Sequence, residues 1–247
     1  MALALRTPDT LDKTTLFIAK RDGLDKVLKL LQYTSKLMLS VSGNGSLANE
    51  TLLRLGDFAA SVGQSRKAFR LGKFLGDANK MRRQPPLTTK LGMLEGISNV
   101  SNCTFYFMEQ FVWLCKAGLI KDKEWERKFA KASVYAEMMA YLTNITINSL
   151  KLAAILEREI ALCNDLKRCK KEDGISPEGE LSISTEIADL QARRTLRMVD
   201  ILQDSLDSLI TLNEIRGGLG RVAGHPTLLA TAGLLSAAIS ARKTWPS

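Results

Sequence analysis

The sequence is poor in the residues from which catalytic and metal centres are usually built. Its 247 residues include one histidine, His225, so a zinc site with several histidine ligands cannot form. The four cysteines contain no C-x-x-C pair, which argues against a zinc site or a disulfide framework. No set of nucleophile, base and oxyanion donor can be assembled. The sequence therefore predicts neither an enzyme nor a protein that binds a cofactor or a metal.

Negative charge is also scarce. Lys and Arg total 35 against 26 Asp and Glu, which gives a net charge of +9 and suggests an anionic partner. The densest cationic segment, Arg54–Arg83, holds eight Lys or Arg residues and two Asp residues. Because it lacks aromatic residues placed for base stacking, nucleic acid is a poorer candidate than an anionic phospholipid surface. The pattern predicts a basic amphipathic helix that lies in the plane of a membrane or serves as a calmodulin-like target, with a solvated basic face as the alternative.

No long stretch alternates apolar and polar residues, so the chain reads as all-α. Apolar positions spaced 4-3-4-3 predict one amphipathic helix over residues 13–39 and another from about residue 48. From Gly63 onward the apolar stripe of this second helix becomes charged. A straight helix cannot bury both stripes against the same surface, so we expect a kink near Gly63.

A C-terminal run of 20 residues, Val222–Ala241, carries no formal charge. As one helix it would cover roughly 30 Å, the thickness of the hydrocarbon core of a bilayer. Arg221 and Arg242 flank the run as interface anchors. The sequence predicts a C-terminal transmembrane helix, with a buried helix of a soluble bundle as the alternative. A stripe of small residues would let such helices pack closely: Gly233, Ala237 and Ala241.

Two further segments, 91–115 and 132–150, are apolar but contain carboxylates. Glu95 and Glu109 lie in the first segment and Glu137 lies in the second. A carboxylate at membrane depth is costly unless it faces a protein partner or water. These segments are therefore expected either to lie in the membrane interface or to pack on one another.

The fold class predicted from these patterns is a membrane-associated all-α bundle with amphipathic helices and a C-terminal transmembrane helix. The chain divides into four regions. They are an N-terminal amphipathic region over 1–86, a central helical membrane-associated region over 87–171, an exposed linker over 172–185, and an amphipathic helix with the transmembrane helix over 186–247.

Three blocks of sequence resemble one known family. They are RDGLDKVLKLLQYTSKLM at Arg21–Met38, SRKAFRLGKFL at Ser65–Leu75 and EQFVWLCKAGLI at Glu109–Ile120. Their order and spacing, with the glycine-bearing apolar terminus, resemble the peroxin-eleven family, the peroxisome-proliferation factors of the peroxisomal membrane. The third block is similar to the plant-type branch.

The resemblance implies an integral peroxisomal membrane protein with both termini in the cytosol. It implies that the chain elongates peroxisomes before fission, self-associates, and works with a dynamin-type GTPase and its adaptor. The basic residues Arg66, Lys67, Arg70 and Lys73 would then engage lipid headgroups. The apolar residues that would enter the acyl boundary of the cytosolic leaflet are Phe69, Leu71, Phe74 and Leu75.

Two other functions remain open at this point. One is a membrane channel for small metabolites, lined by Glu95, Glu109 and Glu137. The other is a soluble all-α adaptor that happens to be basic.

Overall fold

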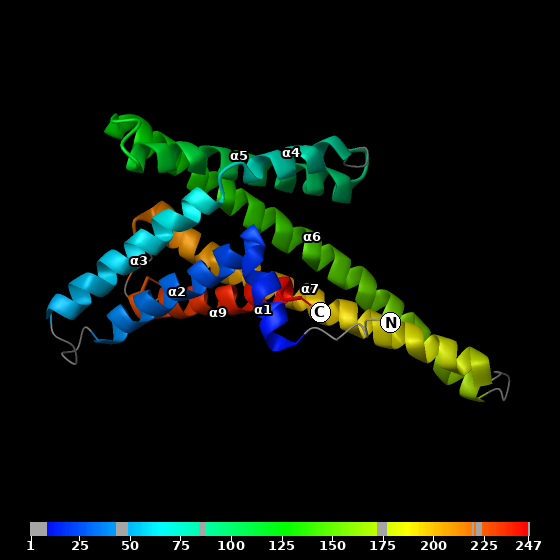
Figure 1. Cartoon of the computed structure of the whole chain (residues 1–247). Helices are drawn as coiled ribbons and strands as arrows, with labels where there is room; N and C mark the ends of the chain where they lie inside the picture. Colours follow the sequence, from blue (N-terminus) through cyan, green and yellow to red (C-terminus); the bar gives the residue numbers. More distant parts are fainter. Residues whose placement is uncertain are drawn as a thin grey trace, which may run out of the picture.

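The computed structural model describes residues 9–42, 49–83, 87–171, 177–218, 220 and 224–246. Within these ranges the chain forms helices and no strand, which confirms the all-α prediction (Figure 1). The helices are α1 (Thr10–Ala19), α2 (Arg21–Ser42), α3 (Asn49–Phe69), α4 (Lys73–Arg83), α5 (Lys90–Lys116), α6 (Lys123–Lys171), α7 (Pro177–Arg216) and α9 (Pro226–Thr244).

The first predicted helix is in fact two helices. A capping box between Asp9 and Asp12 starts α1, which ends at Lys20 in an extended conformation. The chain then turns so tightly that a Cβ on Gly23 would lie 1.8 Å from the carbonyl oxygen of Phe17. Glycine at position 23 therefore permits the break that the 4-3-4-3 spacing did not reveal.

The predicted kink near Gly63 is wrong, because α3 continues through this residue to Phe69. Gly63 instead allows close packing, since a Cβ there would lie 2.5 Å from Nε2 of Gln32 on α2. The chain breaks later, in a turn around Gly72, whose φ is +74°. The helix needs no kink at Gly63, because the charged residues that follow on α3 pair with buried carboxylates of α2 and α5.

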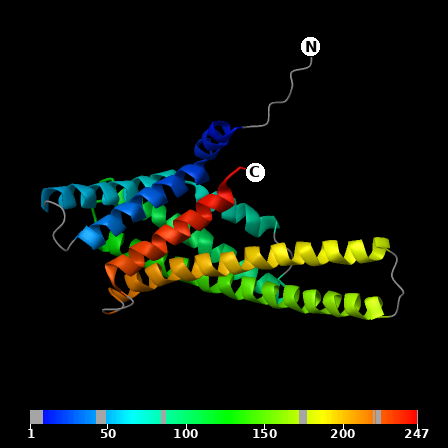
Figure 2. The ribbon, with the colours of Figure 1, turned by 90° about the horizontal axis from the view of Figure 1, so that it is seen from below.

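The longest helix, α6, has 49 residues and an axial length of about 74 Å. It contains the whole apolar segment 132–150 within one continuous helix. With α7 it forms a helical pair that projects from the rest of the molecule as an arm (Figures 1 and 2). Because α7 begins at Pro177, the predicted linker 172–185 is already helical from residue 177.

The C-terminal uncharged run does not form a single helix. Residues 221–223 lie outside the described part, and α9 begins at Pro226, after a turn capped by His225. Only the sixteen residues 226–241 are helical before Arg242, about 24 Å of helix and less than a bilayer core. Among the described residues, the segment long and apolar enough to cross a membrane is Lys123–Arg168 of α6. By length and composition, the candidate span among these residues therefore lies in α6 rather than at the C-terminus.

A buried polar contact joins three helices that are distant in the sequence. The Lys29 ammonium group on α2 donates to both carboxylate oxygens of Asp207 on α7, at 2.8 and 3.0 Å. It also donates to Oγ of Ser236 on α9 at 2.8 Å, and this hydroxyl donates to Asp207 at 2.6 Å. Every member of the contact is buried. Each polar group thus finds a partner, as a low-dielectric interior requires.

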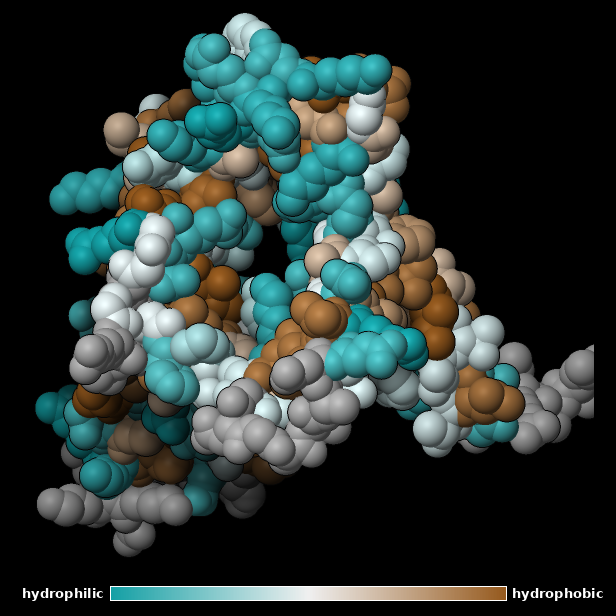
Figure 3. Space-filling model, turned by 90° about the vertical axis from the view of Figure 1, so that its left-hand side faces the viewer, coloured by the Kyte–Doolittle hydropathy of each residue, from teal (hydrophilic) through white to brown (hydrophobic). Residues whose placement is uncertain are grey.

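Polar and charged side chains make up about half of the buried non-glycine residues in the described ranges. Large apolar side chains, in contrast, lie exposed along the helices, and hydrophobic patches are visible on the face drawn in Figure 3. A protein surrounded by water seldom shows this distribution, whereas lipid tolerates exposed apolar groups. Exposed apolar residues of α5 and of residues 123–150 in α6 are Met93, Ile97, Val100, Phe107, Trp125, Tyr135, Met139, Leu142 and Leu150.

Replacing Asp207 with alanine is expected to destabilise the fold by about 3–5 kcal/mol, because it leaves the buried Lys29 charge without its partner. Thermal unfolding of the detergent-solubilised chain, followed by circular dichroism, measures the loss. The control is Asp189→Ala, which breaks an exposed pair with Arg193 and should cost below about 1 kcal/mol. Equal losses in the two variants would contradict a buried Lys29–Asp207 pair as the tie between helices.

Candidate functional site

The basic segment Ser65–Leu75 binds two buried carboxylates on neighbouring helices. Arg66 on α3 donates from Nε to Oδ1 of Asp25 on α2 at 3.1 Å. Its Nη1 donates to Oε1 of Gln32, also on α2, at 2.7 Å. The heptad spacing of α2 places Asp25 and Gln32 on the same side of that helix, two turns apart. Arg66 therefore fixes the register of α3 against α2.

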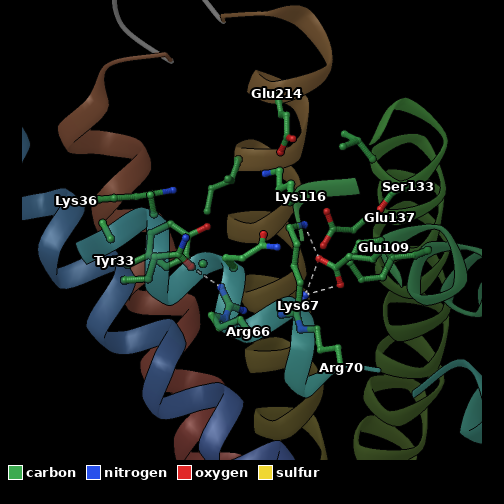
Figure 4. Close-up of a pocket in the computed structure, with 18 of the residues that line it drawn as sticks. Tyr33, Lys36, Arg66, Lys67, Arg70, Glu109, Lys116, Ser133, Glu137 and Glu214 are labelled. Atoms are coloured by element: carbon green, nitrogen blue, oxygen red, sulfur yellow. Dashed lines mark hydrogen bonds and ion pairs between the residues drawn. The ribbon is translucent and has the colours of Figure 1, made fainter. Parts of the chain in front are cut away.

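Arg70 lies in the turn between α3 and α4 and bridges two helices. Its Nε donates to Oδ1 of Asp25 at 3.2 Å, and its Nη1 donates to Oε2 of Glu109 on α5 at 3.2 Å. The Lys67 ammonium group donates to Oε1 of Glu109 at 2.9 Å. Figure 4 shows Arg66 and Lys67 of α3 and Arg70 of the following turn directed inward, with Glu109 facing them from α5. We call Asp25, Arg66, Lys67, Arg70 and Glu109 the ion-pair cluster.

The two carboxylates of the ion-pair cluster stay charged because of their cations. Burial would raise the pKa of Asp25, but the charges of Arg70 and Arg66 outweigh burial and hold this pKa well below its usual range. Burial likewise opposes ionisation of Glu109, and Arg70 and Lys67 lower its pKa below the usual value. The stability that the cluster supplies is therefore present above the ordinary carboxylate pKa and is lost only in acid.

The ion-pair cluster, apart from Asp25, lines one side of a cavity of about 580 Å³ between α2, α3, α5, α6 and α7 (Figure 4). Tyr33, Lys36, Glu137 and Glu214 contribute to the other walls. Figure 3 shows that the molecule is hollowed on the side it presents. The cavity gives buried charged groups a polar surrounding in a molecule whose outer surface is rich in apolar residues.

The apolar side chains of the same segment point the other way. Phe69, Leu71 and Leu75 are 40%, 36% and 61% exposed, whereas Phe74 is half-buried against Phe107 of α5. The segment thus turns its cations toward the protein and an apolar edge outward. Lys73 is intermediate, since it donates to Asp22, a carboxylate on α2 that is itself largely exposed.

The chain matches the peroxisomal biogenesis factor 11 (PEX11) family over residues 11–245, which include the ion-pair cluster and the apolar edge. It is 35% identical to Peroxisomal membrane protein 11A of Arabidopsis thaliana over 242 residues, covering 97% of this chain and 94% of the relative. It is 36% identical to Peroxisomal membrane protein 11-3 of Oryza sativa subsp. japonica, covering 97% and 90%. No solved structure matches. The chain belongs to the peroxisomal biogenesis factor 11 family.

Membership confirms the resemblance drawn from the three sequence blocks. The chain is a peroxisomal membrane protein of peroxisome biogenesis and not an enzyme. A peroxisomal membrane protein does not fit the soluble adaptor that the sequence left open. The prevalence of exposed apolar side chains agrees with this location.

Asp25 is not among the site residues predicted from the sequence. Glu109 was predicted only as a carboxylate at membrane depth. The signal for their pairing was absent, because Arg70 lies 45 residues from Asp25 and 39 from Glu109 in the sequence. No local spacing links residues so far apart. The inverted stripe after Gly63 was the one available hint, since a charged inward face needs partners of opposite charge.

The predicted stripe of small residues on α9 packs within the chain. A Cβ on Gly233 would lie 2.1 Å from the Tyr33 ring of α2, so only glycine allows this approach. Ala237 is fully buried and Ala241 is half-buried. Close packing of α9 is thus directed at α2, and packing between transmembrane helices stays a prediction.

A row of aspartates on α7 forms a second charged feature next to the Lys29 contact. Asp200, Asp204 and Asp207 share one side of the helix, and Lys243 of α9 pairs with Asp200. Burial, and after it the charge of Asp207, raise the pKa of Asp204 to about 7, although Lys243 and Lys29 act in the opposite direction. Asp204 therefore takes up a proton near neutral pH.

The raised pKa of Asp204 predicts that stability falls as pH rises. Between the ordinary value of 3.8 and about 7 the folded chain binds a proton at Asp204 that the unfolded chain has released. Folding is therefore favoured at the acidic end of this window and loses that advantage toward pH 7. Asp204→Asn should reduce the decrease of the unfolding temperature with rising pH and should raise the unfolding temperature above wild type at pH 8. Unfolding temperatures of the variant and the wild type, measured at intervals from pH 5 to pH 8, give this pH dependence.

Asp57→Asn is the matched control, because Asp57 is an exposed aspartate on α3. This variant should keep the wild-type pH profile. A wild-type slope in the Asp204→Asn variant would show that another group causes the pH dependence.

Proposed function

We propose that the chain curves and elongates the peroxisomal membrane by inserting Ser65–Leu75 into the cytosolic leaflet, and that it thereby promotes peroxisome proliferation and fission. The observation that supports this proposal is the orientation of the segment. Its apolar edge faces outward while its cations bind Asp25 and Glu109 inside. An apolar edge held out by buried ion pairs is available to lipid without unfolding of the bundle.

The energies make insertion favourable. Full burial of Phe69, Leu71 and Leu75 contributes about 1.5–3 kcal/mol each, reduced by the fraction that is already covered in the folded chain. Each cation near an anionic surface adds about 1 kcal/mol. A wedge in one leaflet expands that leaflet alone, and the area mismatch between the two leaflets bends the bilayer.

The ion pairs change the roles expected of the basic residues. Arg66, Lys67 and Arg70 position the segment, because headgroup contact would require each of them to leave a buried carboxylate. We assign headgroup contact instead to Lys73, whose partner is exposed, and to the cations at the end of α4. These are Arg82 and Arg83, whose side chains are exposed, whereas Lys80 pairs with the buried carboxylate of Asp77.

The proposal places both termini in the cytosol, which requires an even number of crossings. A contact between Phe17 of α1 and Trp245 after α9, with ring centroids 5.2 Å apart, supports it because it holds both ends of the chain together. Self-association would raise the density of wedges on the membrane. Recruitment of a dynamin-type GTPase and its adaptor would then cut the elongated organelle.

Vesicle tubulation by the reconstituted chain tests the wedge. The variant Phe69→Ser, Leu71→Ser, Leu75→Ser removes the outward apolar edge and leaves the ion-pair cluster intact, so tubulation should be lost while helicity and unfolding temperature stay near wild type. Three exposed apolar residues of α7 serve as the control: Leu181→Ser, Leu196→Ser and Leu202→Ser. Tubulation that survives in the edge variant, or is lost equally in the control, would overturn the proposal.

The cavity supports a second candidate function, a channel for small metabolites. Glu109 and Glu137 line it, but Glu95 lies outside the lining and pairs with Lys151 at 2.8 Å. If the chain is a channel, solute flux through reconstituted bilayers should fall when Glu109 and Glu137 become glutamine and should persist in Glu95→Gln. The wedge proposal expects no flux above that of empty vesicles in any of these proteins. Flux assays and tubulation assays on the same preparations separate the two functions.

A further inference from the structure

Five aromatic rings form a continuous strip across three helices. Phe74 of α4 contacts Phe107 of α5 with ring centroids 5.3 Å apart, and Phe107 contacts Phe111 at 5.2 Å. Phe111 then stacks on Phe129 of α6 at 4.8 Å, and Phe129 stacks on Trp125 at 5.5 Å. We call these five residues the aromatic strip.

The aromatic strip lies at the surface near the turn between α5 and α6. Trp125 is 51% exposed and Phe107 is 40% exposed, and Leu119 in the turn itself is 74% exposed. Offset and edge-to-face packing orders these rings, and the strip is exposed at Trp125 and Phe107 while its other rings are half-buried. An ordered, partly exposed apolar strip of this kind marks an interaction surface.

Exposed cations are dense in the segment that carries one end of the aromatic strip, and one of them contacts the strip directly. Lys128 lies over the Trp125 ring, with its ammonium nitrogen 5.0 Å from the ring centroid, and pairs with Glu124. The segment from Lys116 to Lys131 carries six cations and three carboxylates. We call its exposed cations the basic rim: Lys116, Lys121, Lys123, Arg127, Lys128 and Lys131.

The aromatic strip also continues into an apolar face of α6. Immediately after Phe129 and Lys131, the exposed side of the helix carries Tyr135, Met139 and Leu142. This is the helix in which the described residues contain a segment able to cross a membrane. Aromatic rings and cations at the end of an apolar helix are the usual anchors at the boundary between lipid and water.

From these contacts we infer that the aromatic strip and the basic rim form a docking surface for the interface of an anionic phospholipid bilayer. The rings lie at the level of the headgroups and the cations of the rim contact phosphate groups. Charge complementarity selects lipid over a second copy of the chain, because symmetric pairing of this surface would bring two basic rims together. The surface extends the membrane contact beyond Ser65–Leu75 to the α5–α6 turn, and its test does not depend on tubulation.

Fluorescence of a single tryptophan tests the docking surface on the full-length chain. The substitutions Trp113→Phe and Trp245→Phe leave Trp125 as the one fluorophore, and the chain is reconstituted into vesicles of phosphatidylcholine with or without phosphatidylserine. Bromine atoms placed at shallow or deep positions of the acyl chains report its depth. In anionic vesicles the emission of Trp125 should shift to the blue and be quenched most strongly by shallow bromines, with little quenching by aqueous acrylamide.

Charge variants of the single-tryptophan chain test the rim. Lys121→Glu with Lys123→Glu should abolish the blue shift and the bromine quenching gained in anionic vesicles. The matched control, Lys167→Glu with Arg168→Glu on the arm, makes the same change in net charge and should leave both signals. Circular dichroism confirms that each variant is folded.

Two outcomes would overturn the inference. Strong acrylamide quenching of Trp125 in anionic vesicles would place the ring in water. Protection of Trp125 from both quenchers, relieved as the ratio of protein to lipid is lowered, would show that a second copy of the chain covers the surface.

Discussion

Pairing of buried charges is the constraint on which the rest of the structure depends. Lys29 with Asp207, and Arg70 with Asp25 and Glu109, join α2 to α7 and α5 through groups that cannot be left alone in a low-dielectric interior. Each pair fixes which side of its helix faces inward. Once those sides are fixed, the apolar side chains opposite them must face outward, where lipid rather than water can accommodate them.

This arrangement, with charged side chains inside and apolar side chains outside, explains how a strongly basic chain can work at a membrane without using all its cations for headgroup contact. Within Ser65–Leu75, Arg66 and Lys67 form ion pairs that hold the segment against the rest of the bundle. Phe69, Leu71 and Leu75 are consequently presented outward on a rigid support. A wedge on a rigid support displaces lipid more effectively than a flexible one, because it loses less conformational freedom on insertion.

The fold also brings together the surfaces proposed to contact the membrane. Phe74 belongs to Ser65–Leu75 and begins the aromatic strip that leads through α5 to the start of α6. The apolar edge, the strip and the apolar side of α6 are thus connected through neighbouring residues rather than scattered over the surface. At the opposite end of α6, the arm formed with α7 extends from the bundle (Figure 2).

The sequence by itself determined the helical class, the basic character and the family, because periodicity, charge and the three sequence blocks are local and survive without coordinates. Predictions from the sequence were wrong where contacts between residues distant in the sequence decided the structure. The kink expected at Gly63 moved to Gly72 because Asp25 and Glu109 accept the charged stripe. The C-terminal run was broken by a turn before Pro226. Only tertiary structure could show that the cations point inward, since their carboxylates lie some 40 residues away and charge pairing depends on distance in space.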